Sequence, residues 1–305
     1  MTVPLESVDL RKTYRYKGRE NLAISNFTFT VRRSMIFSLL GRNGSGKTTF
    51  VKIATTQLEQ DSGTVRVFGK DIKTDADEIR SMTSLVPQES RPFPHLTPRE
   101  HVYYYQRMLG NTREGAKDST DYVCRLLDMD YFADKECVNL SGGQKQLTMV
   151  AISLSADAQI YFLDEPTIGL DVITRRKVWE AIQKFKEKGK TIILTTHYLD
   201  EAAALSDEIA IVSYGTLVRQ GTLDGLRSAL SHDTRVFLPG VRYDQSYAKF
   251  GESQELPNGL LLYTDRESVD EILAGNMISK SRIEVGPVGL DDVFISLVGE
   301  QIEGE

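Results

Sequence analysis

The sequence of 305 residues contains few cysteines, no long apolar run and no cluster of basic residues. Two cysteines in a chain of this length, with no secretory signal pattern in residues 1–10, indicate reduced intracellular thiols. No apolar run approaches the roughly 18 residues of a membrane-spanning helix, so we expect any action at a membrane to depend on a partner. The formal net charge is -6, with 37 basic and 43 acidic residues, which argues against nucleic acid as the main partner. The four histidines show no metal-ligand spacing.

The strongest motif lies at residues 41–48, where Gly-Arg-Asn-Gly-Ser-Gly-Lys-Thr fits a phosphate loop. The apolar run Met35–Leu40 before it predicts a buried strand, and Thr49–Gln57 after it, free of Pro and Gly, predicts a helix. In this context backbone N–H groups and the helix N-terminus can bind phosphate. We expect Lys47 to reach the β- and γ-phosphates and the Thr48 hydroxyl to bind Mg²⁺. The candidate nucleotide-binding residues of this loop are Gly41, Arg42, Asn43, Gly44, Ser45, Gly46, Lys47, Thr48 and Thr49.

Two adjacent carboxylates, Asp164 and Glu165, follow the apolar run Ile160–Leu163, which predicts a buried strand. Asp164 is a candidate for Mg²⁺, either as a direct ligand or one step removed from the ion. Side chains alternate along an extended chain, so we expect Glu165 to point the other way, toward the γ-phosphate, and to polarise water. Two acids side by side at a strand end are costly unless a cation or a catalytic role accounts for them.

Three further positions are candidates for ligand binding, and each has a structural alternative. Gln88 ends the predicted strand Ser84–Gln88, where α/β sheets place ligand contacts, although a solvated loop glutamine is the better interpretation of that residue alone. Ser141 is a natural N-cap, and the glycines after it leave a helix N-terminus open to an anion, although Ser-Gly-Gly alone is more often a flexible turn. A lone histidine after a strand is usually structural, but His197 ends a strand, Lys190–Thr196, of the same predicted sheet, which favours function.

The chain changes character twice. Residues Leu96–Ser141 form a helical insertion, with one helix starting at the Thr97 cap and ending near Gly110, and a second over about Ser119–Asp128. After residue 230 the pattern predicts a small α+β domain. Its predicted strands are His232–Leu238, Leu260–Thr264 and 282–285, and its predicted helices are Glu267–Ala274 and Leu290–Val298. We therefore predict one domain over 1–230, with an insertion at about 89–155, and a second over 231–305.

Over about residues 3–230 these motifs resemble the ATP-binding subunit of ABC transporters. The matching motifs, in the family's order, are Gly41–Thr49 (Walker A), Gln88 (Q-loop), Leu140–Gln144 (signature), Ile160–Glu165 (Walker B with the extra Glu) and His197 (switch histidine). The resemblance implies a P-loop NTPase fold of class α/β, with a RecA-like core sheet, an N-terminal antiparallel β subdomain and the helical insertion. The chain departs from the family pattern at Leu147 and Ile152, where relatives often carry Arg, and at Ala158, where Pro is usual.

The resemblance also implies roles for single residues. Tyr14 takes the place of the adenine-stacking aromatic, with Tyr16 as the alternative; spacing alone leaves open whether both are strand-edge aromatics. Glu165 and His197 would be catalytic, and Mg²⁺ would lie near Thr48, Gln88 and Asp164. Two chains would meet head to tail, so that each ATP also contacts the signature of the opposite subunit, namely Ser141, Gly142, Gly143 and Gln144.

The same resemblance implies a place in the cell and a partner. The chain would be a cytoplasmic subunit, held on the inner face of the cell membrane by an integral-membrane permease on a separate chain, with residues 89–105 as the docking surface. The ending Gly286–Phe294 is similar to that of the drug- and lipid-exporting branch, which favours an exporter over an importer. The alternative is a soluble non-transport ABC ATPase that acts on ribosomes or DNA; the single phosphate loop and the lack of a long basic or coiled insert disfavour it.

Overall fold

The computed structural model describes residues 2–88, 90–228, 230–275 and 283–303. The chain divides into two compact units, Met1–Gln220 and Gly221–Glu305, which are described separately. The division thus falls before the boundary that we placed after residue 230. Helix α8 (Leu223–Arg227) accounts for the difference, because it contacts the C-terminal helix α10 (Leu290–Glu303) within the second unit.

The core of the first unit is a six-stranded sheet in the order β10-β9-β3-β8-β7-β6. Its strands are β3 (Ile36–Leu40), β6 (Thr83–Val86), β7 (Ile160–Asp164), β8 (Thr191–Thr196), β9 (Glu208–Ser213) and β10 (Thr216–Gly221). The neighbours from β9 to β6 are parallel, so their carboxyl ends lie along one edge. Strands β3, β7 and β8 are buried at every position because both faces of the sheet are covered.

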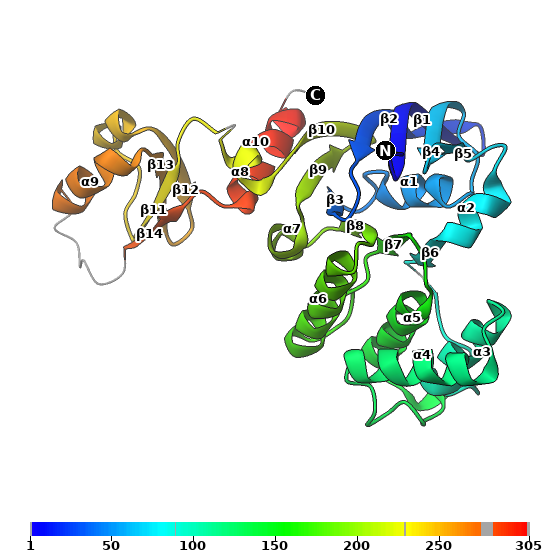
Figure 1. The fold of residues 1–305 in the computed structure, drawn as a ribbon. Coiled ribbons are helices and arrows are strands. Elements are labelled where there is room, and N and C mark those ends of the chain that lie inside the picture. The colour runs from blue at the N-terminus through cyan, green and yellow to red at the C-terminus, as the bar shows by residue number, and fades with distance from the viewer. Residues whose placement is uncertain (1, 89, 229, 276–282, 304–305) are drawn as a thin grey trace. The chain divides into compact units, whose positions relative to one another are not determined.

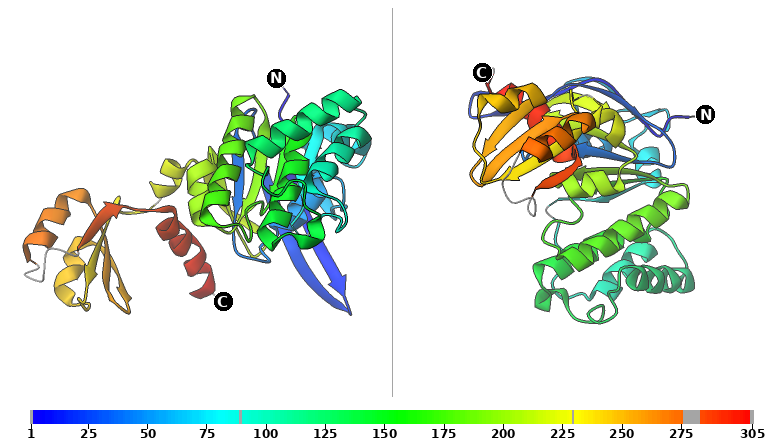
Figure 2. Two further views of the ribbon diagram at one scale, coloured as in Figure 1. Left: turned by 90° about the horizontal axis from the view of Figure 1, so that it is seen from below. Right: turned by 90° about the vertical axis from the view of Figure 1, so that its left-hand side faces the viewer.

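A second, antiparallel sheet has the order β2-β1-β4-β5. Its strands are β1 (Leu5–Tyr16), β2 (Arg19–Val31), β4 (Ser62–Val67) and β5 (Lys70–Asp71). The aromatic side chains of Phe29 and Phe37 stack at 5.0 Å, and Phe29 also contacts Phe50 of helix α1, so α1 packs between the two sheets. Beyond this core the β1–β2 hairpin continues as a long ribbon that projects from the unit (Figure 2).

The described residues of the first unit also form eight helical segments. They are α1 (Lys47–Ala54), α2 (Ala76–Met82), α3 (Pro98–Met108), α4 (Arg113–Leu126), a 3-10 turn (Cys137–Asn139), α5 (Gly142–Ser155), α6 (Val172–Glu187) and α7 (Leu199–Leu205). Helices α3, α4 and α5 pack together as the helical insertion, at the opposite end of the unit from the antiparallel sheet (Figure 1).

The predicted first residues of helices α3 and α4 can be compared with the observed ones. The capping box of Thr97 with Glu100 confirms the start predicted for α3. The start predicted for α4 near Ser119 is wrong: the helix begins at Arg113, because the Thr112 side chain accepts a hydrogen bond from the Gly115 backbone. Gly115 lies in the first turn, and because glycine is unfavourable in helices, the sequence did not indicate a helix start at Thr112.

The second unit is a four-stranded sheet with helices, in the order β12-β13-β11-β14. Its elements are α8, β11 (Thr234–Pro239), β12 (Glu252–Leu256), β13 (Gly259–Thr264), α9 (Val269–Gly275), β14 (Glu284–Pro287) and α10, with 3-10 turns at Gln245–Phe250 and Arg266–Ser268. Strand β12 was not predicted, because its sequence is polar and it forms an exposed edge of the sheet. The strand predicted over 282–285 corresponds to β14, and residue 282 lies outside the described part. In the described part of the chain, no helix has the length and apolar character to cross a bilayer.

Candidate nucleotide-binding site

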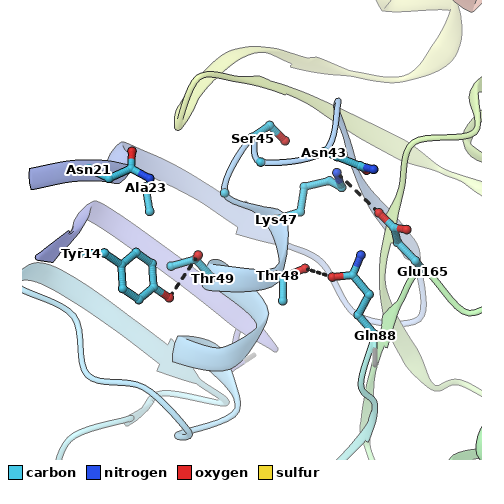
Figure 3. Close-up of a pocket in the computed structure, with 12 residues that line it drawn as sticks. Tyr14, Asn21, Ala23, Asn43, Ser45, Lys47, Thr48, Thr49, Gln88 and Glu165 are labelled. Atoms are coloured by element: carbon cyan, nitrogen blue, oxygen red, sulfur yellow. Dashed lines mark hydrogen bonds and ion pairs between the residues drawn. The ribbon is translucent and has the colours of Figure 1, made fainter. Parts of the chain in front are cut away.

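The phosphate loop leaves the carboxyl end of β3 and enters α1, as its sequence context predicts. It lines a cavity of about 260 Å³ together with residues of the β1–β2 hairpin and the ends of β6 and β7 (Figure 3). Gly44 and Gly46 have φ of 82° and 103°, which side-chain-bearing residues rarely adopt. A Cβ at Gly46 would lie 2.4 Å from the Ala23 carbonyl oxygen, so the loop is seated directly against β2.

Lys47 lies under this loop and is 4% exposed. Its Nζ donates to the carbonyl oxygens of Gly41 at 2.8 Å and Arg42 at 3.1 Å, and it lies 3.8 Å from Glu165 Oε1. Burial lowers the pKa of the Lys47 ammonium, while the carboxylates of Glu165 and Asp164 oppose that shift. The ammonium is thus held beside the loop and the carboxylates, where a phosphate group can reach it.

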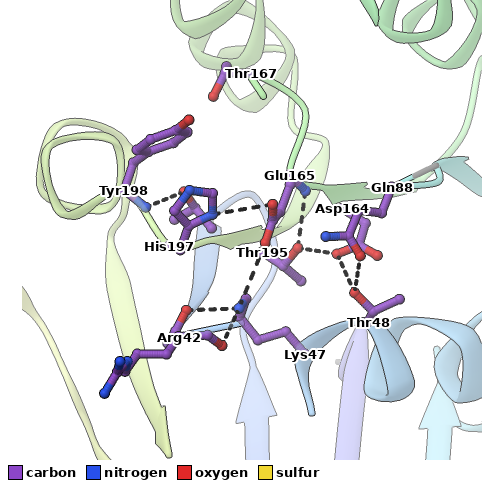
Figure 4. Close-up of polar contacts among 12 residues, drawn as sticks. Arg42, Lys47, Thr48, Gln88, Asp164, Glu165, Thr167, Thr195, His197 and Tyr198 are labelled. Carbon is purple, nitrogen blue, oxygen red and sulfur yellow. Dashed lines mark hydrogen bonds and ion pairs between the residues drawn. The ribbon is translucent and has the colours of Figure 1, made fainter. Parts of the chain in front are cut away.

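The three residues expected near Mg²⁺ converge, although they come from α1, the segment after β6 and the end of β7. Thr48 Oγ1 lies 3.0 Å from Gln88 Oε1 and 3.3 Å from Asp164 Oδ1 (Figure 4). Burial raises the pKa of Asp164, and hydrogen bonds from Thr195 and Thr48 oppose this. These hard oxygen donors fit Mg²⁺, which usually takes one or two carboxylates and completes its shell with water and substrate phosphates. Among the residues that the structure describes, no group of three or more His, Cys, Asp and Glu side chains is arranged to hold a metal ion.

Glu165 follows directly, and its carboxylate faces Lys47 and His197, whereas that of Asp164 contacts Thr48 and Thr195. The reason is not the extended chain that we assumed, because β7 ends at Asp164 and Glu165 is left-handed, with φ of 51°. Its Oε2 lies 3.2 Å from His197 Nδ1, which follows β8. The geometry of this contact is not that of a hydrogen bond. Among the described residues, Glu165 Oε2 and His197 Nδ1 are both buried and have no other hydrogen-bond partner. Both side chains therefore keep hydrogen-bonding capacity for a water or a phosphate.

The β1–β2 hairpin forms one end of the cavity. Tyr14 lines it with its hydroxyl 3.4 Å from Thr49 Oγ1, and the residue is 39% exposed (Figure 3). Asn21 and Ala23 line it too, and the sequence analysis missed both. Asn21 is opposite Tyr14 in the strand register, which a sequence shows only once the hairpin turn is known. The side chain of Tyr16 lies outside the described part.

The signature residues do not belong to this cavity. Ser141 caps α5 by accepting from the Gln144 backbone, while the Gln144 side chain accepts from the Ser141 backbone. Ser141 and Gly142 are exposed, whereas Gly143 and Gln144 are half-buried. The structure thus brings Gln88, the two carboxylates and His197 to the phosphate loop, and presents the signature on another surface.

A second, larger cavity of about 1000 Å³ lies between the segment after β6 and the start of α5. Its lining residues are Gln88, Ser90, Arg91, Pro92, Pro94, Cys137, Val138, Gly142, Lys145 and Gln146. Part of the predicted docking surface, namely residues 90–92 and 94, therefore lines a cavity shared with the helical insertion. Gln88 lines both this cavity and the one at the phosphate loop.

Comparison with known proteins identifies the family. Residues 24–168 match the ABC transporter family. The chain is 36% identical over 247 residues to the retinal-specific phospholipid-transporting ATPase ABCA4 of Bos taurus, covering 81% of this chain but 11% of that protein. It is 29% identical over 292 residues to the daunorubicin/doxorubicin resistance ATP-binding protein DrrA of Streptomyces peucetius, covering 91% and 88%. The chain thus spans about a tenth of ABCA4 and most of DrrA.

The chain also aligns with solved structures of ATP-binding cassettes. The ATP-binding subunit of an ABC transporter aligns with a TM-score of 0.66 at 26% identity, covering 75% of this chain and 93% of that one. A dimeric ATP-binding cassette bound to ADP and Pi aligns with a TM-score of 0.67 at 24% identity, over 72% and 98%, which supports the fold alone. The predicted α/β P-loop NTPase fold is confirmed. The chain belongs to the ABC transporter family, as an ATP-binding ATPase cassette.

Proposed function

We propose that this protein is the ATP-hydrolysing subunit of a membrane exporter whose permease is a separate chain. One observation carries the proposal: Lys47, the Thr48–Gln88–Asp164 oxygens and the Glu165–His197 pair converge on one phosphate-loop cavity. The likeness to DrrA, named as a drug-resistance ATP-binding protein, extends over 91% of this chain and so includes most of the second unit. That coverage supports an exporter rather than an importer.

Each residue at the cavity has a separate role in the proposed hydrolysis of ATP. Lys47 and the loop N–H groups hold the β- and γ-phosphates of ATP. Thr48, Gln88 and Asp164 would hold Mg²⁺, which supplies charge neutralisation at those phosphates when bound. Glu165 polarises the attacking water and takes its proton on a carboxylate oxygen, while His197 orients the γ-phosphate and the water. Tyr14 stacks on the adenine.

The proposed working unit is a head-to-tail homodimer. Exposed Ser141 and Gly142 lie at the N-terminus of α5, where backbone N–H groups suit an anion. Since these groups do not line their own chain's cavity, a second copy supplies them to the ATP. ATP then joins two subunits, and hydrolysis releases them. Gln88, which lines both cavities, would pass this change to a permease segment docked over residues 89–105.

The variant Glu165→Gln tests hydrolysis and dimerisation in one experiment. The amide keeps the size of the side chain but cannot accept the proton, so we expect turnover to fall by about 10²- to 10⁴-fold with ATP binding retained. Phosphate release measures turnover, and light scattering after size exclusion measures mass with and without MgATP. We expect a dimer only with MgATP. Turnover close to wild type would remove Glu165 from catalysis, and a monomer in saturating MgATP, even with the permease, would refute the shared site.

The proposed location, cytoplasmic and peripheral on the inner membrane face, depends on the permease. When the protein is purified from membranes under conditions that keep complexes intact, it should copurify with a protein that spans the membrane several times. Deletion of residues 90–94 should abolish that recovery while the ATPase activity of the isolated chain remains. Recovery with ribosomes or DNA instead would favour the non-transport alternative.

A further inference from the structure

We propose that Thr195, through its hydroxyl, is a positioning residue for the ATPase reaction that fixes the carboxylate of Asp164 and the backbone of Glu165 together. The inference rests on the proposed function and adds a residue that the sequence motifs do not include. Thr195 lies in β8, with Leu39 of β3 on one side and Asp164 of β7 on the other. It is fully buried.

The Thr195 hydroxyl makes two contacts of opposite kind (Figure 4). Its Oγ1 donates a hydrogen bond to Asp164 Oδ1 and accepts one from the Glu165 backbone N–H at 3.1 Å. A hydroxyl has one proton and two lone pairs, so it can serve both neighbours at once. An aliphatic side chain of the same shape could serve neither.

The first contact orients the carboxylate near the proposed Mg²⁺ position. Asp164 Oδ1 also lies 3.3 Å from Thr48 Oγ1, but that hydroxyl has one proton and lies 3.0 Å from a second acceptor, Gln88 Oε1. Asp164 is 2% exposed, so water offers little replacement for a lost hydrogen bond. Removing the Thr195 hydroxyl would therefore leave the orientation of this carboxylate to a contact that Thr48 shares with Gln88.

The second contact holds the backbone of Glu165 in a conformation that costs energy. A left-handed φ in a residue with a long side chain is sparsely populated and persists only where the surroundings impose it. The Glu165 N–H is shared between Thr195 Oγ1 and the Thr195 carbonyl oxygen, both at 3.1 Å. Without the hydroxyl, a single backbone acceptor remains to fix the direction in which Glu165 points.

Three full-length variants test this role. Thr195→Val keeps the volume and removes the hydroxyl, and Thr195→Ser keeps the hydroxyl and removes the methyl group. Thr191→Val is the matched control, because Thr191 is a buried threonine of the same strand whose hydroxyl accepts from one backbone N–H, that of Ser34, at the far end from the site. All three are compared with wild type.

Two readouts separate positioning from stability. Steady-state ATPase assays give kcat and KM, and a fluorescent ATP analogue gives binding with Mg²⁺ and with EDTA. For Thr195→Val we expect kcat to fall by roughly 10- to 100-fold, KM to change little, and the gain in nucleotide affinity from Mg²⁺ to shrink. Thr195→Ser should restore both. Thr191→Val should lower the unfolding midpoint as Thr195→Val does, without either functional change.

The outcomes decide between the two proposals. If wild type hydrolyses ATP and Thr195→Val matches it in kcat and in Mg²⁺ dependence, the role of Thr195 is refuted and the proposed function stands. Equal losses in Thr195→Ser and Thr195→Val would also refute it, because the methyl group would then matter rather than the hydroxyl. If Thr195→Val folds poorly, Thr195→Ala replaces it in the same comparison. A wild type without MgATP hydrolysis would instead refute the proposed function.

Discussion

Replacing Gly46 by alanine perturbs the phosphate loop at one defined point. The added Cβ would lie 2.4 Å from the Ala23 carbonyl oxygen, and Cβ atoms essentially never approach a neighbour closer than 3.0 Å. The loop or β2 must therefore move by at least about 0.6 Å. Catalytic groups need to be held within roughly 0.5 Å of their working positions, and a misplacement of about 1 Å can cost 10²-fold. We expect kcat/KM for MgATP to fall by roughly 10- to 100-fold.

The control is Gly110→Ala at the end of α3. Gly110 also has a left-handed φ, 89°, but a Cβ there would meet nothing within 4 Å. It therefore carries the conformational cost alone, about 1–2 kcal/mol of unfolding free energy, with no effect on the ATPase. Urea unfolding and steady-state kinetics on both variants separate the two costs. A Gly46→Ala enzyme with the kcat/KM of wild type would show that the loop is not held against β2 as described.

Two further predictions concern single side chains. Tyr14→Ala should raise KM for ATP by roughly 5- to 100-fold, because base stacking on an aromatic ring is worth about 1–3 kcal/mol, while Tyr14→Phe should not; equal KM values in all three proteins would exclude stacking. Burial raises the pKa of Glu201, against hydrogen bonds from Thr196, Thr167 and Trp179, so the folded state binds this proton more tightly than the unfolded state. The stability of wild type relative to Glu201→Gln is therefore highest at low pH and should fall as pH rises from about 4.3 through the folded pKa. A difference in urea unfolding that stays constant from pH 4 to pH 8 would contradict this.

Much of the site follows from the sequence because its residues lie at the ends of fully buried strands. The strands β3 and β7 are short apolar runs next to polar motifs, and the parallel order of the sheet brings those motifs to one edge. In β7, Ile160 and Phe162 pack in one core cluster while Tyr161 and Leu163 pack in the other, which explains why the run is continuous.

The remainder depends on pairings that no local signal encodes. Asn21 reaches the cavity only because β1 and β2 pair as far as the turn after Tyr16, and shifts of register within that ribbon cannot be counted from the sequence. The hydroxyl of Thr195 contacts Asp164, at the end of another strand, and Glu165, the residue after it, and a β-branched run in the sequence does not indicate either contact. The exposed edge strand Glu252–Leu256 lacks the apolar alternation on which strand prediction depends.

Several departures from ordinary local rules meet at Glu165, and their coincidence itself supports a functional site. Of the nine non-glycine residues with positive φ in the described chain, Glu165 alone is buried. The others are exposed or half-buried: six lie in turns, and Asp9 and Asn26 lie in the part of the β1–β2 ribbon where the register shifts. The same residue is one of two adjacent buried carboxylates that share Lys47 as a nearby cation, and its Oε2 lacks a hydrogen-bond partner within the described residues. A buried unpaired polar atom costs about 1–3 kcal/mol, and a strained backbone costs a similar amount. Selection for stability alone would remove such a residue, so its environment is better explained by the role toward water that we propose for Glu165.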